Sequence, residues 1–155
     1  MKIIVTNNPS APQKAAIYYL WNNEYPRQLA FHHYDELEGY LTTLSDRHHY
    51  FVADNAGRIF GWAVVFEREN ERWFAIIIDG AWHRKGVGAM LLAALKETET
   101  ELNGWVTDHD RYTRQDGTAY PSPLTFYSKN GFVVCAETRL ETEKLNAVKI
   151  RWNRQ

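Results

Sequence analysis

The segment from His48 to Asp79 constrains the fold more than any other part of the chain. Two runs of β-forming residues, HHYFVAD and RIFGWAVVFE, flank a turn at residues 54–57, which is a strong hairpin signal. A polar turn, RENE, then leads into RWFAIIIDG, whose run of one alanine and three isoleucines predicts a strand that is buried on both faces. We therefore expect an antiparallel meander of three strands over residues 48–79.

The rest of the chain alternates strand and helix patterns around this meander. Further strand patterns lie at residues 1–7, 104–108, 132–140 and 146–152. Helical patterns lie at residues 13–22, 34–45, 86–100 and within 122–132, the last ending at Gly131. A polar loop is expected at 109–120. The resulting order, β-α-α-β-β-β-α-β-α-β-β, predicts an α/β fold with mixed strand directions.

Composition supports a single folded domain over residues 1–155. Hydrophobic residues make up 45% of the chain and charged residues 24%, which suits a packed core rather than disorder. The formal net charge of -1 gives no electrostatic footprint for a nucleic-acid binder. The one cysteine, Cys135, excludes an intrachain disulfide, and no stretch approaches the roughly 20 apolar residues of a membrane span. We expect a cytoplasmic protein that binds neither nucleic acid nor membrane.

A basic turn precedes the longest helical pattern. The stretch DGAWHRKGVGAMLLAAL places His83, Arg84 and Lys85 before two glycines, Gly86 and Gly88. A helix N-terminus carries partial positive charge and free N–H groups, so cations disfavour the helix there but suit a bound phosphate. Glycine also lets a ligand approach the backbone. We interpret the turn as an anion site, and the alternative is an ordinary strand-to-helix turn that happens to be basic.

Two motifs, in this order, resemble the GNAT superfamily of N-acetyltransferases. HRKGVGA, at residues 83–89, resembles the family motif R/Q-x-x-G-x-G/A, and FYSKNGF, at residues 126–132, resembles the motif aromatic-Tyr-x-K-x-G-F. The order of strands and helices resembles the family layout over nearly the whole chain. The resemblance implies a single GNAT-like domain with a central mixed, mostly antiparallel twisted sheet of about seven strands, flanked by about four helices. His83 stands where the family usually has Arg or Gln, and it can still donate a hydrogen bond to phosphate.

The resemblance implies that acetyl-CoA is the acyl donor. In the family, the pyrophosphate lies on the backbone amides of the glycine motif and the pantetheine arm pairs with the preceding strand. Ser122 stands near the position where many members have an asparagine that contacts the cofactor. By position, the residues expected to bind acetyl-CoA are Ile76, Ile77, Ile78, His83, Arg84, Lys85, Gly86, Val87, Gly88, Ala89, Ser122 and Tyr127.

Tyr127 and Asp108 are the residues that we expect to catalyse the transfer. The amine must lose a proton, and the leaving thiolate must be protonated or stabilised. Tyr127 matches the family tyrosine near the thiol sulfur and is expected to act as the general acid, the alternative being a core aromatic. Asp108 is expected to be the base, the alternative being a solvated loop residue. His109 is the second candidate for the base, and the weaker ones are Glu67, Asp79 and Glu24.

The acceptor is expected to be a primary amine of a small molecule or a peptide. The loop at 109–120 is longer than the usual family connection, and a long polar loop near the chemistry suits acceptor recognition. Its Arg111 and Arg114 suit a carboxylate on the acceptor, whereas Asp110 and Asp116 suit an amine. These mixed charges leave the acceptor open.

Further expectations concern the acceptor cleft, metals and partners. Trp21 and Tyr25, at the end of the first helix, are expected to line the cleft that the family builds partly from its first two helices. No metal is expected, because adjacent histidines at 32–33 and 48–49 diverge on helices and strands alike. A homodimer is compatible with the resemblance, because dimers occur in the family.

Two other classes of function remain open from the sequence. A non-catalytic acyl-CoA-binding module that senses the cofactor would keep the glycine turn but would not need Tyr127 or Asp108. A small interaction domain without a ligand would need none of these residues, and the basic helix start argues against it.

Overall fold

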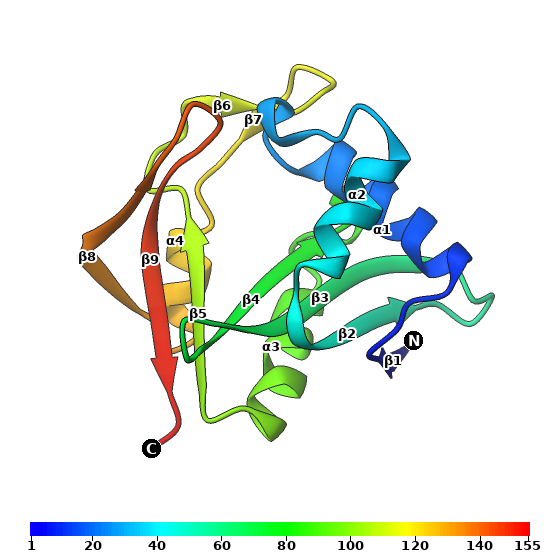
Figure 1. The fold of residues 1–155 in the computed structure, drawn as a ribbon, viewed down its shortest axis with the longest axis horizontal. Helices are drawn as coiled ribbons and strands as arrows, with labels where there is room; N and C mark the ends of the chain where they lie inside the picture. Colours follow the sequence, from blue (N-terminus) through cyan, green and yellow to red (C-terminus); the bar gives the residue numbers. More distant parts are fainter.

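The computed structural model describes residues 1–155, which form four α-helices, two 3₁₀ turns and nine strands (Figure 1). The helices are α1 (Ala11–Glu24), α2 (Tyr34–Thr42), α3 (Val87–Thr98) and α4 (Leu124–Lys129), and the 3₁₀ turns are Arg27–Leu29 and Gly80–Trp82. The strands are β1 (Lys2–Thr6), β2 (Ser45–Ala53), β3 (Ile59–Arg68), β4 (Glu71–Ile78), β5 (Glu101–Val106), β6 (Tyr112–Thr113), β7 (Ala119–Tyr120), β8 (Val133–Glu141) and β9 (Asn146–Asn153).

Seven strands form one sheet in the order β1-β2-β3-β4-β5-β9-β8, and β6 and β7 form a separate small hairpin. Every pair in the large sheet is antiparallel except β4 with β5, which run parallel. A parallel pair needs a crossover connection, and α3 provides it between these two strands. The crossover places the start of α3 at the end of β4.

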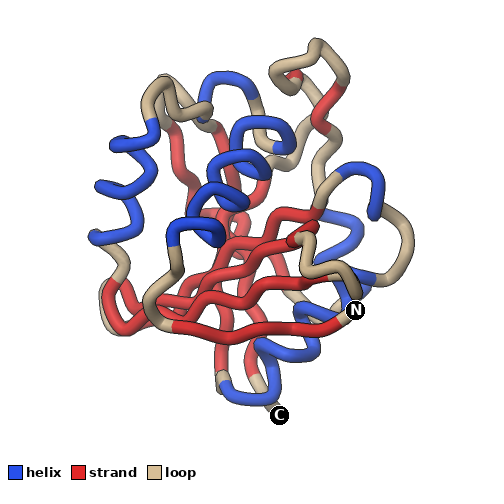
Figure 2. Tube along the Cα trace, turned by 90° about the vertical axis from the view of Figure 1, so that its right-hand side faces the viewer, coloured by secondary structure: helices blue, strands red, loops and turns tan.

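Helices cover both faces of this sheet and create two cores (Figure 2). The core on one side joins α1 and α2 to the sheet through residues such as Ile17, Leu37 and Trp62, all of which are fully buried. The core on the other side joins α3 and α4 to the sheet and includes Leu91 and Tyr127. Because β4 and β5 contribute to both cores, side chains from both faces of the sheet could contact a ligand held between these two strands.

The parallel strands β4 and β5 are joined at one end and separate toward the other. Trp73 and Asn103 are the single pair of residues in register between them. A polar network fastens the joined end: the Asn103 amide donates to the Arg72 carbonyl at 2.9 Å, and Arg72 pairs with Glu99 at 2.7 Å. We call the space beyond the Trp73–Asn103 pair the β4–β5 gap. Backbone groups along this gap are left without a strand partner, as a ligand that pairs like a strand requires.

The structure confirms the expected fold class and the meander, which is β2, β3 and β4 in antiparallel register. The helix expected from residue 86 begins at Val87, because Gly86 has a φ of +81° and caps the helix. The loop expected at 109–120 contains the β6–β7 hairpin, so the expectation of a purely irregular loop was wrong. No helix is long and apolar enough to cross a membrane.

Candidate active site

The glycine turn shapes the start of α3. The first backbone hydrogen bond of the helix runs from the Met90 N–H to the Gly86 carbonyl at 3.0 Å. The N–H groups of the first helical turn before Met90 are therefore available to a ligand, and the helix dipole favours an anion there. Arg84 has a φ of +62°, in the left-handed region that non-glycine residues rarely adopt. Backbone strain of this kind often marks a binding site.

Gly88 keeps this helix start narrow enough to pack against α4. A Cβ atom at this position would lie 3.0 Å from the Phe126 ring, which is closer than normal contact allows. By contrast, a Cβ atom at Gly86 would meet nothing within 4 Å, so Gly86 is required by its positive φ rather than by space. The two glycines of the motif therefore have different physical roles.

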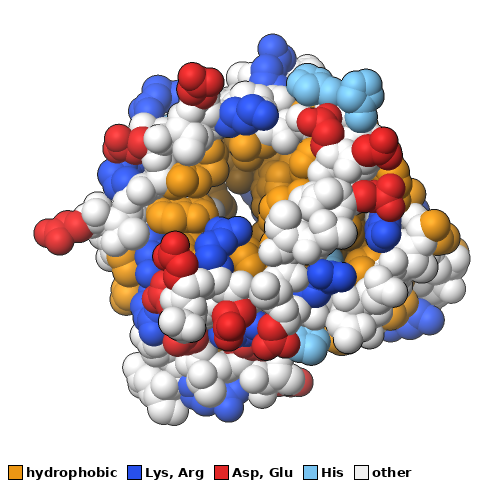
Figure 3. Space-filling model, viewed as in Figure 1, with side chains coloured by type: hydrophobic (Ala, Val, Ile, Leu, Met, Phe, Trp, Pro, Cys, Tyr) orange, Lys and Arg blue, Asp and Glu red, His pale blue; other side chains and the backbone are white.

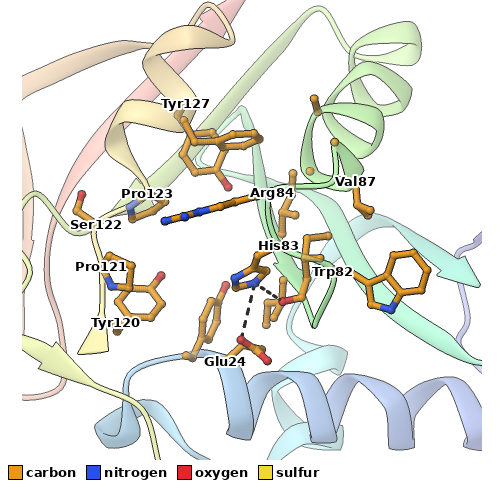
Figure 4. A pocket seen from close by; sticks show the side chains of 18 of the residues that line it. Glu24, Trp82, His83, Arg84, Val87, Tyr120, Pro121, Ser122, Pro123 and Tyr127 are labelled. Carbon is orange, nitrogen blue, oxygen red and sulfur yellow. Dashed lines mark hydrogen bonds and ion pairs between the residues drawn. The ribbon is translucent and has the colours of Figure 1, made fainter. Parts of the chain in front are cut away.

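A cavity of about 520 Å³, which we call the glycine-turn cavity, opens in front of this helix start (Figure 4). Its walls come from β4, the turn before α3, the β6–β7 hairpin, α4 and the end of α1. The residues that line it and that the sequence had placed at the donor site are Ile76, Ile77, Ile78, His83, Arg84, Gly86, Val87, Gly88, Ala89, Ser122 and Tyr127.

Lys85 is the one expected donor-site residue that does not line the glycine-turn cavity. Its ammonium group lies 5.3 Å from the Trp82 ring centroid, in a cation–π contact. Arg84, in contrast, extends its side chain across the cavity toward Pro123 (Figure 4). Of the two basic residues in the turn, Arg84 therefore brings the positive charge to the cavity.

Glu24, at the end of α1, carries the one carboxylate that lines either large cavity. Its oxygens accept a hydrogen bond from the Gly80 N–H at 2.8 Å and lie 3.8 Å from His83 Nε2 and 3.7 Å from Arg114 Nε. His83 Nε2 also lies 2.8 Å from the Ile78 carbonyl oxygen, so this nitrogen carries the proton (Figure 4). The His83 ring therefore faces Glu24 and β4, and the expected donation of its proton to phosphate would require the ring to leave these contacts.

Tyr127 enters the cavity from α4, and its side chain is directed inward (Figure 4). The residue is 7% exposed, and its ring contacts Phe74 and Phe132 with centroids 5.6 and 5.3 Å away. Burial raises the pKa of the Tyr127 phenol well above its usual range. Tyr127 therefore stays protonated at neutral pH and can donate a hydrogen bond to a group in the cavity.

A second cavity of about 380 Å³ lies beyond Tyr127, on the side of α1 and α2. We call it the aromatic cavity, because rings such as those of Trp21, Trp73 and Trp105 form much of its wall. Figure 3 shows a hollow lined with hydrophobic side chains on this side of the molecule. The residues that line both cavities are Tyr25, Ile76, Tyr120, Pro123 and Tyr127. The two cavities thus meet at the β4–β5 gap, with the Tyr127 phenol at the junction.

Trp21 and Tyr25 both line the aromatic cavity, where the sequence had placed the acceptor cleft. Ser122, in the segment before α4, lines the glycine-turn cavity, and its hydroxyl donates to the Thr107 carbonyl and accepts from the Leu124 N–H at 3.2 Å. The Ser122 hydroxyl therefore holds α4 against the end of β5.

Asp108 lies apart from both cavities. Its carboxylate accepts two hydrogen bonds from the Arg139 guanidinium, at 2.8 and 3.1 Å. These hydrogen bonds hold the pKa of Asp108 below its usual range, so the carboxylate is a weaker base than a free one. His109 also lines neither cavity, and its Nε2 lies 3.3 Å from the Asn146 carbonyl oxygen. The structure therefore does not bring Asp108 or His109 together with Tyr127.

The remaining acidic candidates also lie outside the cavities. Glu67 is exposed on β3. Asp79 accepts a hydrogen bond from the Ala81 N–H at 2.9 Å and pairs with Arg58 at 3.9 Å, so it caps the 3₁₀ turn before the glycine turn. No group of three or more His, Cys, Asp or Glu side chains is placed to hold a metal ion.

Tyr120 is the site residue that the sequence analysis missed. It belongs to the β6–β7 hairpin, lines both cavities and lies under the Arg114 guanidinium, which is 5.8 Å from its ring centroid. Burial raises the pKa of Tyr120 to about 12. The pair Asp116-Gly117, with a φ of +86° at the glycine, is a hairpin signal that the sequence does contain.

Comparisons with known proteins give the family of this fold. A family model described as an acetyltransferase (GNAT) domain matches residues 46–134. No curated protein sequence matches the chain. An aminoglycoside 6'-N-acetyltransferase, solved with coenzyme A, is similar over 99% of this chain and 97% of its own, with 12% identity and a TM-score of 0.74.

Two further solved structures share this fold. A phosphinothricin acetyltransferase from Sinorhizobium meliloti, in complex with AcCoA, is similar over 99% of this chain and 89% of its own, with 12% identity and a TM-score of 0.68. A spermidine N-acetyltransferase mutant from Vibrio cholerae is similar over 99% and 95%, with 17% identity and a TM-score of 0.66. The family model covers more than half of the chain, including both motifs up to residue 134. This protein therefore belongs to the GNAT acetyltransferase family.

Proposed function

We propose that this protein transfers the acetyl group of acetyl-CoA directly to a primary amine, with donor and acceptor bound at the same time. The observation that carries this proposal is the meeting of two cavities at Tyr127, one with the N-terminus of α3 in its wall and the other lined with aromatic rings. Such an arrangement brings two ligands together end to end. The similar solved structures, whose names include aminoglycoside and spermidine N-acetyltransferases, support an amine as the acceptor class.

The glycine-turn cavity fits the donor by its chemistry. The open N–H groups at the start of α3 and the Arg84 guanidinium would hold the pyrophosphate. The side of β4 that faces the β4–β5 gap, at residues 76–78, would pair with the amides of the pantetheine arm as a strand would. The thioester would then lie at the junction of the two cavities.

Tyr127 would act on the sulfur. When the amine nitrogen forms its bond to the carbonyl carbon, the carbon–sulfur bond breaks and the sulfur leaves with the electron pair. The Tyr127 phenol, which burial keeps protonated, would donate its proton to that sulfur, and the phenolate would regain a proton from water when the products leave. The same dry surroundings also raise the pKa of the departing thiol, which favours the transfer.

Glu24 would take the proton that the amine loses. Among the acidic candidates it alone lines a cavity, and its side chain is 15% exposed. Its contacts with Gly80, His83 and Arg114 hold the carboxylate in place. The proton would pass directly or through a water to this carboxylate, and from there to solvent. The expected role of Asp108 as base is less well supported, because Asp108 lines neither cavity and its carboxylate is paired with Arg139.

The alternative is a sensor module that binds acyl-CoA without chemistry. The test is to incubate the purified protein with acetyl-CoA and a panel of primary amines and to follow release of the free thiol. Acetylated amine that depends on Tyr127 and Glu24 supports the enzyme. Tight binding of acetyl-CoA with neither acetylated amine nor released thiol supports the sensor, and thiol release without acetylated amine would show hydrolysis of the thioester and refute both.

A further inference from the structure

The aromatic cavity has a wall that is unusual for a site that receives an amine. No aspartate or glutamate lines it, and its one charged residue is Arg68, at the end of β3. A polyamine or an aminoglycoside carries several positive charges, and such a ligand would meet a cation here with no carboxylate to pair with. The cavity instead offers stacking surfaces and a positive charge, which suit an aromatic molecule with an anionic group.

The Arg68 guanidinium is free to bind an anion. Its central carbon lies 5.0 Å from the Phe66 ring centroid and 5.7 Å from the Trp73 ring centroid. It makes no ion pair and no side-chain hydrogen bond, whereas Arg72 next along the hairpin pairs with both Asp46 and Glu99. Arg68 lines the aromatic cavity beside Tyr40, and its charge partly opposes the rise that burial causes in the pKa of Tyr40.

Two buried polar groups in the wall also lack partners. The Trp73 indole N–H and the Thr107 hydroxyl are buried and make no hydrogen bond within the protein. Both residues line the aromatic cavity. A buried donor without an acceptor costs about 1–3 kcal/mol, so a ligand that supplies an acceptor gains this energy on binding. The Arg68 guanidinium suits the oxygens of an anionic group, and a small turn of the Trp73 indole toward the cavity would let its N–H donate to the same group.

The end of the aromatic cavity near Arg68 and Trp73 and the junction near Ile76 lie at different positions along β4. Phe66 pairs with Trp73 in the sheet, and Trp73 precedes Ile76, which lines both cavities, by three residues. At the rise of a strand, three residues span roughly 10 Å. An anion beside Trp73 would therefore be separated from an amine at the junction by about the length of an aromatic ring with a substituent at each end.

We propose that the acceptor is a small aromatic amine that carries an anionic group, such as a carboxylate, on the side of the ring opposite the amine. Its ring stacks on the aromatic wall, its anion binds Arg68 and the Trp73 N–H, and its amine reaches Tyr127. A cavity of about 380 Å³ holds one such ring and its substituents. This inference rests on the proposed acetyl transfer, because the amine is placed at the junction for that reaction.

The test compares three acceptors: 4-(aminomethyl)benzoate, benzylamine, which lacks the anion, and spermidine. We expect kcat/KM to be highest for 4-(aminomethyl)benzoate, by about 10-fold or more over benzylamine, as expected for a hydrogen bond to a charged group. Arg68→Gln should bring the two aromatic amines close to equal kcat/KM. Lys2→Gln, which removes one positive charge from the distant edge strand β1, should keep the wild-type ratio.

Binding provides a readout that does not need turnover, because Trp21, Trp73 and Trp105 line the cavity. We expect 4-(aminomethyl)benzoate to change the tryptophan fluorescence of the wild type when it binds. In Arg68→Gln the Kd obtained from this fluorescence change should be at least about 10-fold higher. If this ligand binds as expected but no amine is acetylated, the aromatic cavity remains a site for an anionic aromatic ligand and the proposed acetyl transfer is refuted. Preferred acetylation of spermidine, or an aromatic preference that survives Arg68→Gln, would refute the pocket assignment and leave acetyl transfer standing.

Discussion

His49 should make the protein sensitive to acid. It is fully buried on β2, and its Nδ1 accepts a hydrogen bond from the Trp62 indole N–H at 3.0 Å. The ring proton is therefore on Nε2, which has no partner within the protein. Burial, followed by the charges of Arg47 and His48, lowers the pKa of His49 from 6.5 to about 4. Protonation would also place a hydrogen on Nδ1, against the Trp62 N–H.

The sign and size of the effect follow from this shift. Between pH 6.5 and pH 4 the unfolded chain binds a proton at His49 and the native chain does not, so the free energy of unfolding falls as the pH falls. A pH of 5 is about 1.5 units below the pKa of the unfolded imidazole. Protonation of the unfolded chain at His49 therefore lowers the free energy of unfolding by roughly 2 kcal/mol at pH 5. Above about pH 7.5 the unfolded histidine is also neutral, so the contribution of His49 no longer changes.

Urea unfolding followed by tryptophan fluorescence at pH 7 and pH 5 measures this difference. His49→Gln keeps an acceptor for Trp62 but cannot titrate, so its stability should fall by about 2 kcal/mol less than that of the wild type between the two pH values. His32→Gln is the matched control, because it removes an exposed histidine that lies outside the sheet and away from His49. The reasoning fails if the free energy of unfolding falls by the same amount between pH 7 and pH 5 in His49→Gln and in the wild type.

Three other predictions concern the site. Tyr127→Phe should lower kcat by roughly 10²–10⁴-fold in a thiol-release assay, and an unchanged kcat would remove Tyr127 from the mechanism. Gly88→Glu should abolish acetyl-CoA binding in calorimetry, because it adds bulk and negative charge to the helix start, and binding near wild-type strength would contradict the anion site. Glu24→Gln should lower kcat/KM by about 10²-fold or more, whereas Asp108→Asn should mainly cost roughly 1 kcal/mol of stability through loss of the half-exposed pair with Arg139. A larger kinetic loss in Asp108→Asn would restore Asp108 as the base.

Local patterns in the sequence predicted most of the fold. The hairpin turn at 54–57, the isoleucine run of β4 and the glycines before α3 each act over a few residues, and each is found where expected. The glycine turn and β4 line the same cavity because they are adjacent in the chain. The β6–β7 hairpin was missed because the polar residues around Asp116-Gly117 were interpreted as an irregular loop.

Which acidic side chain lines the glycine-turn cavity was harder to predict, because the contacts of these side chains join residues that are distant in the sequence. Asp108 is paired with Arg139, which is 31 residues away, and nothing near Asp108 indicates that its carboxylate is occupied. Glu24 reaches the cavity through contact with Gly80, 56 residues away. The orientation of His83 toward Glu24 likewise depends on how α1 packs beside β4. Packing of distant elements, rather than local pattern, decides which carboxylate lines the glycine-turn cavity.

Calorimetric titration of the purified protein with acetyl-CoA tests most directly whether the glycine-turn cavity is a donor site. Desulfo-CoA and ATP serve as controls, since one keeps the pyrophosphate and pantetheine and the other lacks the pantetheine arm. We predict saturable binding of one acetyl-CoA per chain, with desulfo-CoA also bound and ATP bound far more weakly. Absence of binding at millimolar acetyl-CoA, or equal binding of ATP, would contradict the assignment of β4 and the glycine turn to the donor.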